Sequence, residues 1–165
     1  MLHVGIDASQ AGLVAASTAA ARQAKGGREN ALFVRAAVES LPAELCGMAA
    51  EITVLLPWGS LLAAVATPEV DALRGIRAMA AEGALLTVVF SHDATRDGDS
   101  LVFPDLNDVA ARAALVAAYG DAGWRVDAVE AIDSAGIRAI GTTWAKKLAS
   151  RPGRSGWRVC ATAMP

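Results

Sequence analysis

Short apolar runs alternate with longer helix-like stretches along this chain, and this alternation leaves few fold classes open. Runs such as HVGID (residues 3–7) and ALLTVVF (84–90) have the length and apolar character of buried strands. Strands separated by helical stretches predict an α/β architecture with a mostly parallel sheet. We expect strands at residues 3–7, 31–36, 52–56, 84–90, 124–132 and 156–163, the last two antiparallel to each other, and helices at residues 10–24, 60–81 with a break at Pro68, 107–120 and 142–149.

The length and cysteine content of the chain indicate one domain without cross-links. At 165 residues, of which 54% are apolar, residues 1–165 can bury a core as a single domain. No apolar run approaches the roughly 18 residues of a membrane span, and no signal sequence is evident, so we expect a soluble, cytoplasmic and monomeric protein. Cys46 and Cys160 lie far apart without a histidine cluster, which argues against a disulfide framework and a metal site. We expect both to be small core residues.

Charge is unevenly distributed along the chain. The formal net charge is −2, but everything after Asp133 contains six basic residues and no acid, which leaves −8 for the part before it. Residues 8–28 also lack acids and carry three basic residues. For either segment taken alone, simple surface decoration is the better interpretation. Two basic segments on an acidic body, however, favour local contact with a polyanion over a general effect on solubility.

A Pro-Trp-Gly segment follows the predicted strand at 52–56 and places Trp58 in a loop. Trp144 likewise lies at the edge of a predicted helix. Trp124 and Trp157 lie within predicted strands, where we expect them to pack in the core. Core packing is also the alternative role for Trp58 and Trp144, but their positions at a turn and at a helix edge favour another use.

Two acids end predicted strands at the edge where open α/β sheets bind ligands. Asp7 could accept hydrogen bonds from a ribose diol, or it could cap the helix that follows, which by itself is the commoner role. Glu39 could line an adenine pocket, although by itself it is better interpreted as a solvated loop acid. Only together with other segments of the chain do these two acids favour a nucleotide-binding role.

Four segments occur in the order GIDAS, FVRAAVESLP, LLPWGSLL and TTWAKKL. Together they resemble the aminoglycoside-resistance 16S rRNA (adenine(1408)-N(1))-methyltransferases, and the resemblance covers nearly the whole chain. It implies a Rossmann-like class I S-adenosylmethionine-dependent methyltransferase fold with S-adenosylmethionine as cofactor. It further implies methylation of N1 of adenine(1408) in 16S rRNA within the 30S ribosomal subunit, which confers resistance to aminoglycosides.

The resemblance also implies roles for individual residues. Trp58 and Trp144 match the two tryptophans that hold the flipped target base between them, which would explain the indole in the loop. The residues implied around that base are Pro57, Ser60 and Thr142; those around the cosubstrate ribose and adenine are Asp7, Ala37, Val38 and Glu39; and those on the rRNA are Arg22, Lys25, Arg28, Lys146, Lys147, Arg151 and Arg154.

The implied chemistry needs positioning more than proton transfer. Adenine N1 lies on the Watson–Crick edge, so the base must leave the stack, and each base–aromatic contact contributes about 1–3 kcal/mol. N1 offers its own lone pair at neutral pH, so an in-line attack requires no general base. The lack of catalytic partners for His3 and His92 is therefore no objection, and we expect both histidines to be structural or exposed.

The chain departs from the family at its start. Residues 1–7 correspond to the second family strand, so we expect the first strand and its glycine-rich, cosubstrate-binding loop to be missing. That strand would lie between the strands ending at Asp7 and at Leu56, and its loss should expose backbone donors and acceptors. Either the gene product starts further upstream, or the chain is a shortened relative, for which the alternative function is a non-catalytic RNA-binding remnant. A small-molecule methyltransferase is disfavoured by the acid-free basic tail.

Overall fold

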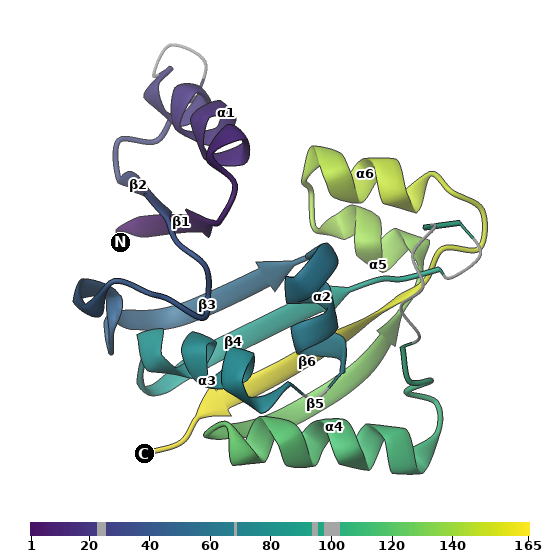
Figure 1. Ribbon diagram of the computed structural model, residues 1–165. Helices are drawn as coiled ribbons and strands as arrows, with labels where there is room; N and C mark the ends of the chain where they lie inside the picture. The colour runs from purple at the N-terminus through teal and green to yellow at the C-terminus, as the bar shows by residue number, and fades with distance from the viewer. Residues whose placement is uncertain (23–25, 68, 94–95, 98–102) are drawn as a thin grey trace. The chain divides into compact units, whose positions relative to one another are not determined.

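Helices and strands alternate along the chain in the computed structural model (Figure 1), which describes residues 1–22, 26–67, 69–93, 96–97 and 103–165. The strands are β1 (His3–Asp7), β2 (Ala31–Arg35), β3 (Ala49–Leu55), β4 (Ala80–Phe90), β5 (Trp124–Ile132) and β6 (Gly156–Ala163). The helices are α1 (Gln10–Ala21), α2 (Gly59–Ala66), α3 (Val70–Met79), α4 (Val109–Asp121), α5 (Ser134–Ala139) and α6 (Thr143–Ala149), with a 3-10 helix at Ala43–Leu45.

Each predicted strand is present, and β1, β5 and β6 have the predicted bounds. The long helical stretch at 60–81 forms two helices, α2 and α3, as the predicted break requires, although Pro68 itself lies outside the described residues. Helix α5 was not predicted. It begins after Asp133, whose Oδ1 accepts a hydrogen bond from the backbone N–H of Gly136 at 2.8 Å and so caps the helix.

Contacts divide the chain into two compact units, Met1–Ala43 and Glu44–Pro165. In the first unit, β1 pairs in parallel with β2. In the second, the strand order is β3–β4–β6–β5, with β3 parallel to β4 and β6 antiparallel to both of its neighbours. The predicted antiparallel pairing of the last two strands is therefore confirmed. Among the described residues, β1 pairs only with β2, and the edge strand β3 pairs only with β4.

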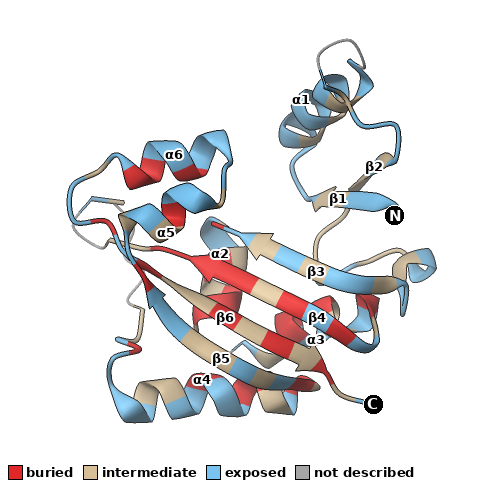
Figure 2. Ribbon diagram, turned by 180° about the vertical axis from the view of Figure 1, so that it is seen from behind, coloured by how far each residue is buried: buried red, intermediate tan, exposed pale blue. Residues whose placement is uncertain are grey.

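The core of the second unit forms where the four-stranded sheet meets its helices (Figure 2). Two buried aromatic side chains form hydrogen bonds between elements, Tyr119 from α4 to α2 and Trp124 from β5 to α3. Tyr119 donates its hydroxyl to the carbonyl of Val65 at 3.1 Å, and Trp124 donates its indole N–H to the carbonyl of Leu73 at 3.2 Å. Burial raises the pKa of the Tyr119 phenol above its usual range, so it remains a donor. Trp124 thus packs in the core as expected, whereas Trp157 is only half-buried.

The first unit, Met1–Ala43, differs from the second in how little of it is buried. None of its described residues is buried (Figure 2). The apolar residue Val14 on α1 is 54% exposed. Burial of apolar surface is the main favourable contribution to folding. Within the described residues, this unit therefore gains little stability from a core of its own.

Cys46 was expected in the core, but it is exposed. It follows the 3-10 helix, and the next residue, Gly47, donates its backbone N–H to the carbonyl of Ala78 at 2.8 Å. This turn runs along the surface, so the thiol has no interior to enter. Cys160 on β6 is half-buried, and both cysteines are free.

Two further findings concern the described part of the chain. None of its helices combines the length and the apolar character needed to cross a bilayer. No group of three or more His, Cys, Asp or Glu side chains is arranged there to hold a metal ion.

His3 is exposed, and His92 is half-buried, with its ring 4.3 Å from that of Phe103.

Candidate functional site

Trp58 projects from a sharp turn between β3 and α2. Leu56, which begins the turn, is buried, donates its backbone N–H to the carbonyl of Val89 at 2.7 Å, and has a φ of +53°. A left-handed backbone costs a side-chain-bearing residue about 1–2 kcal/mol, and proline at the next position adds its own restriction. Gly59 also has a positive φ, +60°. The strained turn leaves Trp58 at the N-cap of α2 with 48% of its side chain exposed.

Trp144 lies in the first turn of α6, 36% exposed. The hydroxyl of Thr142 accepts a hydrogen bond from the backbone N–H of Ala145 at 3.0 Å, so Thr142 is the N-cap of this helix. The cap fixes where α6 begins. Because Ala145 and Leu148 face the interior, Trp144 is directed outward.

A single buried cluster connects the two tryptophan-bearing segments. Leu56 lies two residues before Trp58, Ala145 lies directly after Trp144, and both belong to this cluster. Well-packed interiors resist small displacements, so the cluster fixes the two tryptophan backbones relative to each other. Its members are Leu56, Val89, Ile132, Ile137, Ala145, Leu148 and Ala149, with Ile140 packed against them.

The two indoles contact each other edge to face. Their ring centroids are 6.1 Å apart and their planes are 89° apart. A base stacked between two parallel rings needs about 7 Å between the ring planes, twice the roughly 3.4 Å spacing of stacked bases. The distance between the two ring centroids is therefore close to the spacing that a base stacked between parallel indoles requires. Because the rings are perpendicular, one indole must turn before a base can enter.

Pro57 and Ser60, the other two residues predicted around the base in this segment, lie on either side of Trp58 in the sequence. Pro57 is half-buried, whereas Ser60 is exposed in the first turn of α2. That turn contains no acidic residue, and no side chain caps it. The face of the turn next to Trp58 therefore carries no negative charge that would repel an RNA phosphate.

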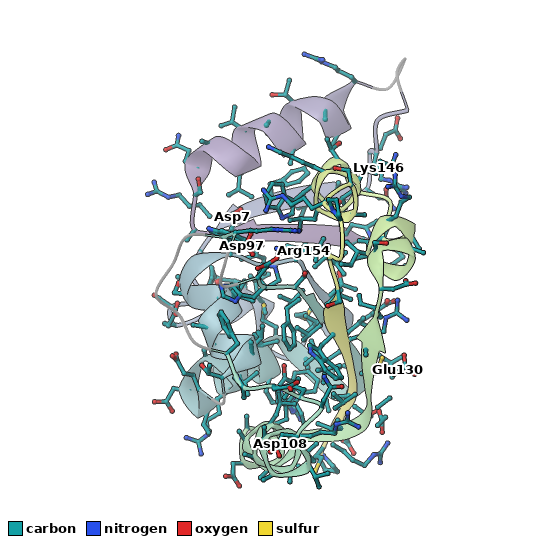
Figure 3. All side chains as sticks on the ribbon, turned by 90° about the vertical axis from the view of Figure 1, so that its right-hand side faces the viewer. Asp7, Asp97, Asp108, Glu130, Lys146 and Arg154 are labelled. Carbon is teal, nitrogen blue, oxygen red and sulfur yellow. The ribbon has the colours of Figure 1, made fainter. Side chains whose placement is uncertain are left out.

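Three of the predicted RNA-contacting residues lie in or just after α6. Lys146, labelled in Figure 3, and Lys147 are exposed, and the Nζ atom of Lys147 lies over the Trp144 ring, 5.6 Å from its centroid. Arg151 is 34% exposed and forms an ion pair with Asp97, with 2.9 Å between Nη1 and Oδ1. A basic surface thus adjoins the second tryptophan.

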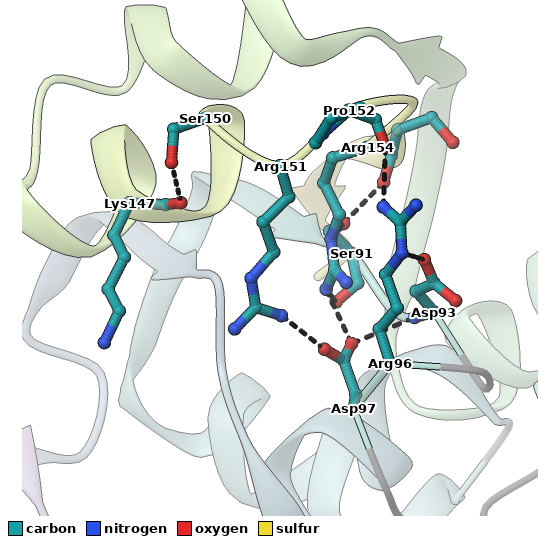
Figure 4. A network of polar contacts seen from close by, with 10 residues as sticks. Ser91, Asp93, Arg96, Asp97, Lys147, Ser150, Arg151, Pro152 and Arg154 are labelled. Atoms are coloured by element: carbon teal, nitrogen blue, oxygen red, sulfur yellow. Dashed lines mark hydrogen bonds and ion pairs between the residues drawn. The ribbon is translucent and has the colours of Figure 1, made fainter.

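Arg154 differs from the prediction of an RNA contact, because its side chain is only 1% exposed. Its Nη2 lies 2.7 Å from Oδ2 of Asp97, its Nε donates to Oγ of Ser91 at 2.7 Å, and its Nη2 also donates to the carbonyl of Ser91 at 2.9 Å (Figure 4). A guanidinium held in this way cannot reach a phosphate on the surface. Its remaining nitrogen, Nη1, is buried with no hydrogen-bond partner among the described residues.

The ion-pair network around Asp97 joins two loops. Arg96 in the same loop donates to the carbonyl of Pro152 at 2.6 Å, so the segment after β4 is fastened to the segment between α6 and β6. Burial alone would raise the pKa of the Asp97 carboxyl, but the hydrogen bond from Arg154 and the charges of Arg154 and Arg151 outweigh it and hold the pKa below 3.8. Sequence reasoning missed Asp97, since nothing distinguishes a buried acid from a solvated one in a polar loop.

The predicted cosubstrate residues lie in the first unit, at the carboxyl ends of its two strands. The Oδ1 atom of Asp7 accepts a hydrogen bond from the backbone N–H of Ser9 at 2.7 Å, and Ser9, not Asp7, is the N-cap of α1. The Asp7 carboxylate is exposed. It therefore retains acceptor capacity that fits a ribose diol.

Residues 37–39 follow β2 at the same edge, because the two strands are parallel and Asp7 is in register with Arg35. An isolated bridge between Ala37 and Ser40 folds this segment into a tight turn. Ala37 and Val38 are half-buried and Glu39 is exposed, which offers an apolar surface beside a polar one.

Of the predicted RNA contacts in this unit, Arg22 and Arg28 are exposed, and Lys25 lies outside the described residues.

The chain is similar to known proteins over most of its length. The family model of NpmA, a 16S rRNA (adenine(1408)-N(1))-methyltransferase, matches residues 1–163. A 16S rRNA (adenine(1408)-N(1))-methyltransferase of Escherichia coli is 32% identical over 162 residues, 95% of this chain and 74% of the relative. One from Streptoalloteichus tenebrarius is 34% identical over 152 residues, 90% of this chain and 70% of the relative.

The chain is also similar to solved structures of 16S rRNA (adenine(1408)-N(1))-methyltransferases. The 16S rRNA (adenine(1408)-N(1))-methyltransferase from Catenulisporales acidiphilia superposes with a TM-score of 0.82 at 32% identity, over 98% of this chain and 76% of that chain. A tryptophan variant of that enzyme, solved with its cosubstrate S-adenosylmethionine, has a TM-score of 0.82 at 31% identity, over 98% and 75% of the two chains. The predicted Rossmann-like class I methyltransferase fold is therefore confirmed, and the chain belongs to the family of 16S rRNA (adenine(1408)-N(1))-methyltransferases.

Proposed function

We propose that this chain is an S-adenosylmethionine-dependent enzyme that methylates N1 of adenine(1408) in 16S rRNA within the 30S subunit and thereby confers aminoglycoside resistance. In this proposal it acts as a monomer. The observation that carries the proposal is the pair of exposed tryptophans, Trp58 and Trp144, which one buried cluster holds at nearly the separation that a flipped base requires.

Capture of the base between the two indoles offsets much of the free-energy cost of flipping it. Turning one indole gives up an edge-to-face contact that contributes about 0.5–1.5 kcal/mol. Two base–indole contacts replace it, at about 1–3 kcal/mol each. The surplus offsets much of the few kcal/mol needed to unstack the base. Trp58 and Trp144 therefore act after the base has left the helix, with Pro57, Ser60 and Thr142 shaping the surroundings of the two rings.

The methyl transfer itself requires no side chain to remove a proton. S-adenosylmethionine, when bound, supplies an electrophilic methyl group, to which adenine N1 offers its own lone pair, so that the positive charge passes to the base. The faces of Trp58 and Trp144 attract a cation, and a base that gains positive charge is held more tightly as the reaction proceeds. The two indoles thus favour the transition state over the neutral substrate.

Residues of the first unit hold the cosubstrate. The exposed carboxylate of Asp7 accepts hydrogen bonds from the ribose hydroxyls, in addition to the one from Ser9. Ala37 and Val38 supply an apolar surface for the adenine ring, and Glu39 supplies a polar group beside it. Docking on rRNA rests on phosphate contacts by basic residues. The exposed ones are Arg22 and Arg28 in the first unit and Lys146 and Lys147 in the second, and the half-buried Arg151 adds to them.

Incubation of the purified chain with 30S subunits and S-adenosylmethionine tests this proposal. A methyl group on N1 blocks Watson–Crick pairing, so reverse transcription of the 16S rRNA should stop next to adenine(1408). Subunits incubated without S-adenosylmethionine serve as the control. Binding to the subunit without a stop would instead support the RNA-binding remnant, whereas a stop at another adenine would contradict the assigned target.

A further inference from the structure

We propose that Lys147 is a positioning residue for Trp144 and thereby links rRNA docking to capture of the target base. This inference rests on the proposed function and deepens it. A basic residue on a docking surface is expected to contact phosphate and nothing else. Lys147 contacts the indole as well, and this second contact gives it a role that its neighbour Lys146 lacks.

The contact follows from the geometry of α6. Trp144 and Lys147 are three residues apart on this helix, so their side chains project from the same face. The ammonium of Lys147 lies over the Trp144 ring, 5.6 Å from its centroid. One face of the indole is therefore covered by a cation, and the opposite face is the one left for a base. Lys146 is also exposed on the same helix, but its side chain makes no hydrogen bond, ion pair or ring contact among the described residues.

The ammonium can bind the ring and a phosphate together. The ammonium carries three N–H donors. Contact with the ring through one N–H leaves the other two free to bind phosphate oxygens. A phosphate bound on the outer side fixes the ammonium, and the ammonium in turn restricts the rotation of the indole. This ordering matters because Trp144 and Trp58 lie edge to face and one ring must turn before stacking. A cation–π contact at an exposed site favours the oriented ring by about two- to five-fold.

Three variants separate positioning from simple charge. Lys147→Gln removes the charge and the ring contact, Lys146→Gln removes only a charge on the same helix, and Lys147→Arg retains both features, because a guanidinium also stacks on aromatic faces. Each variant is compared in two measurements. One is the single-turnover rate of methyl transfer at saturating 30S subunits. The other is quenching of tryptophan fluorescence by acrylamide, a neutral quencher, in a Trp58→Phe background that leaves Trp144 as the most exposed indole.

We expect Lys147→Gln to transfer methyl about two- to five-fold more slowly than Lys146→Gln, and to show stronger quenching, whereas Lys147→Arg restores both values. Equal rates for the two glutamine variants, with or without a difference in quenching, would overturn the proposal. If the parent chain transfers no methyl group, the proposed function fails. Quenching then still decides whether Lys147 holds the indole, and equal quenching in the two glutamine variants would refute it.

Discussion

The ion pair between Asp97 and Arg154 makes the sharpest prediction about stability. Their side chains are 0% and 1% exposed, and Oδ2 and Nη2 lie 2.7 Å apart. Asp97→Asn keeps the shape and one acceptor but leaves the guanidinium buried without its counter-charge. Breaking a buried pair in this way costs about 3–5 kcal/mol, and the retained acceptor favours the lower end. For a chain of this length, about 3 kcal/mol corresponds to a fall in Tm of roughly 6–12 °C.

Urea unfolding followed by circular dichroism measures this effect, with Glu130→Gln as the matched control. Glu130 pairs with Arg158 at 3.7 Å, but both side chains are well exposed, 57% and 36%, so its loss should cost below about 1 kcal/mol. Adding Arg154→Met to Asp97→Asn should recover much of the lost stability, because it removes the orphaned charge. If Asp97→Asn is as stable as Glu130→Gln, the network has no structural role.

Acid provides an independent check on the same pair. The pKa of Asp97 in the folded protein lies below 3.8, its ordinary value. Its contribution is therefore fully present above pH 3.8 and is lost as the pH falls through the folded pKa. The difference in unfolding free energy between the parent and Asp97→Asn should shrink over that acidic range. If the difference in unfolding free energy between the two proteins stays constant over that range, the ionised Asp97 carboxylate does not stabilise the fold.

Three further predictions concern the turn, the cosubstrate and the basic helix. Leu56→Gly should be more stable than Leu56→Ala by about 1 kcal/mol in urea unfolding, because glycine tolerates the positive φ; the opposite order would rule out the left-handed backbone. Asp7→Asn should weaken S-adenosylmethionine binding about tenfold in calorimetry, since hydrogen bonds to a charged group contribute about 1.5–3 kcal/mol; unchanged affinity would remove the ribose contact. Lys146→Ala with Lys147→Ala should reduce the salt slope of 30S binding by about 1.4–1.8, and an unchanged slope would show that neither lysine meets a phosphate.

The strands could be predicted because apolar, β-branched runs bounded by turn residues depend on local sequence alone. Helix α5 could not, since its few residues contain Gly136 and its stability rests on capping by Asp133 and on the burial of Ile137 in the shared cluster. A cap residue before a short apolar segment was the available signal. The position of Trp58 in a loop was correctly predicted, but its edge-to-face contact with Trp144 depends on the folded cluster.

Arg154 shows the limit of reasoning from charge along the sequence. It lies in an acid-free tail, so composition groups it with the exposed Lys146 and Lys147. The acid that pairs with it, Asp97, comes from a loop far away in the sequence, and only the pairing of β4 with β6 brings the two segments together. A buried charge requires such a partner. Composition therefore cannot distinguish a structural arginine from one that binds RNA.

Alanine substitution of each exposed tryptophan tests whether the two indoles capture the target base. Trp58→Ala and Trp144→Ala are compared with the parent for melting temperature, 30S affinity and methyl transfer, and Trp58→Phe is included because it keeps a stacking face. Loss of one stacking contact, at about 1–3 kcal/mol, should slow methyl transfer roughly 5- to 150-fold. Subunit affinity, which rests on phosphate contacts, and melting temperature should change little, since the side chains are 48% and 36% exposed. Unfolding of both alanine variants, or full activity in either, would contradict capture of the base between Trp58 and Trp144.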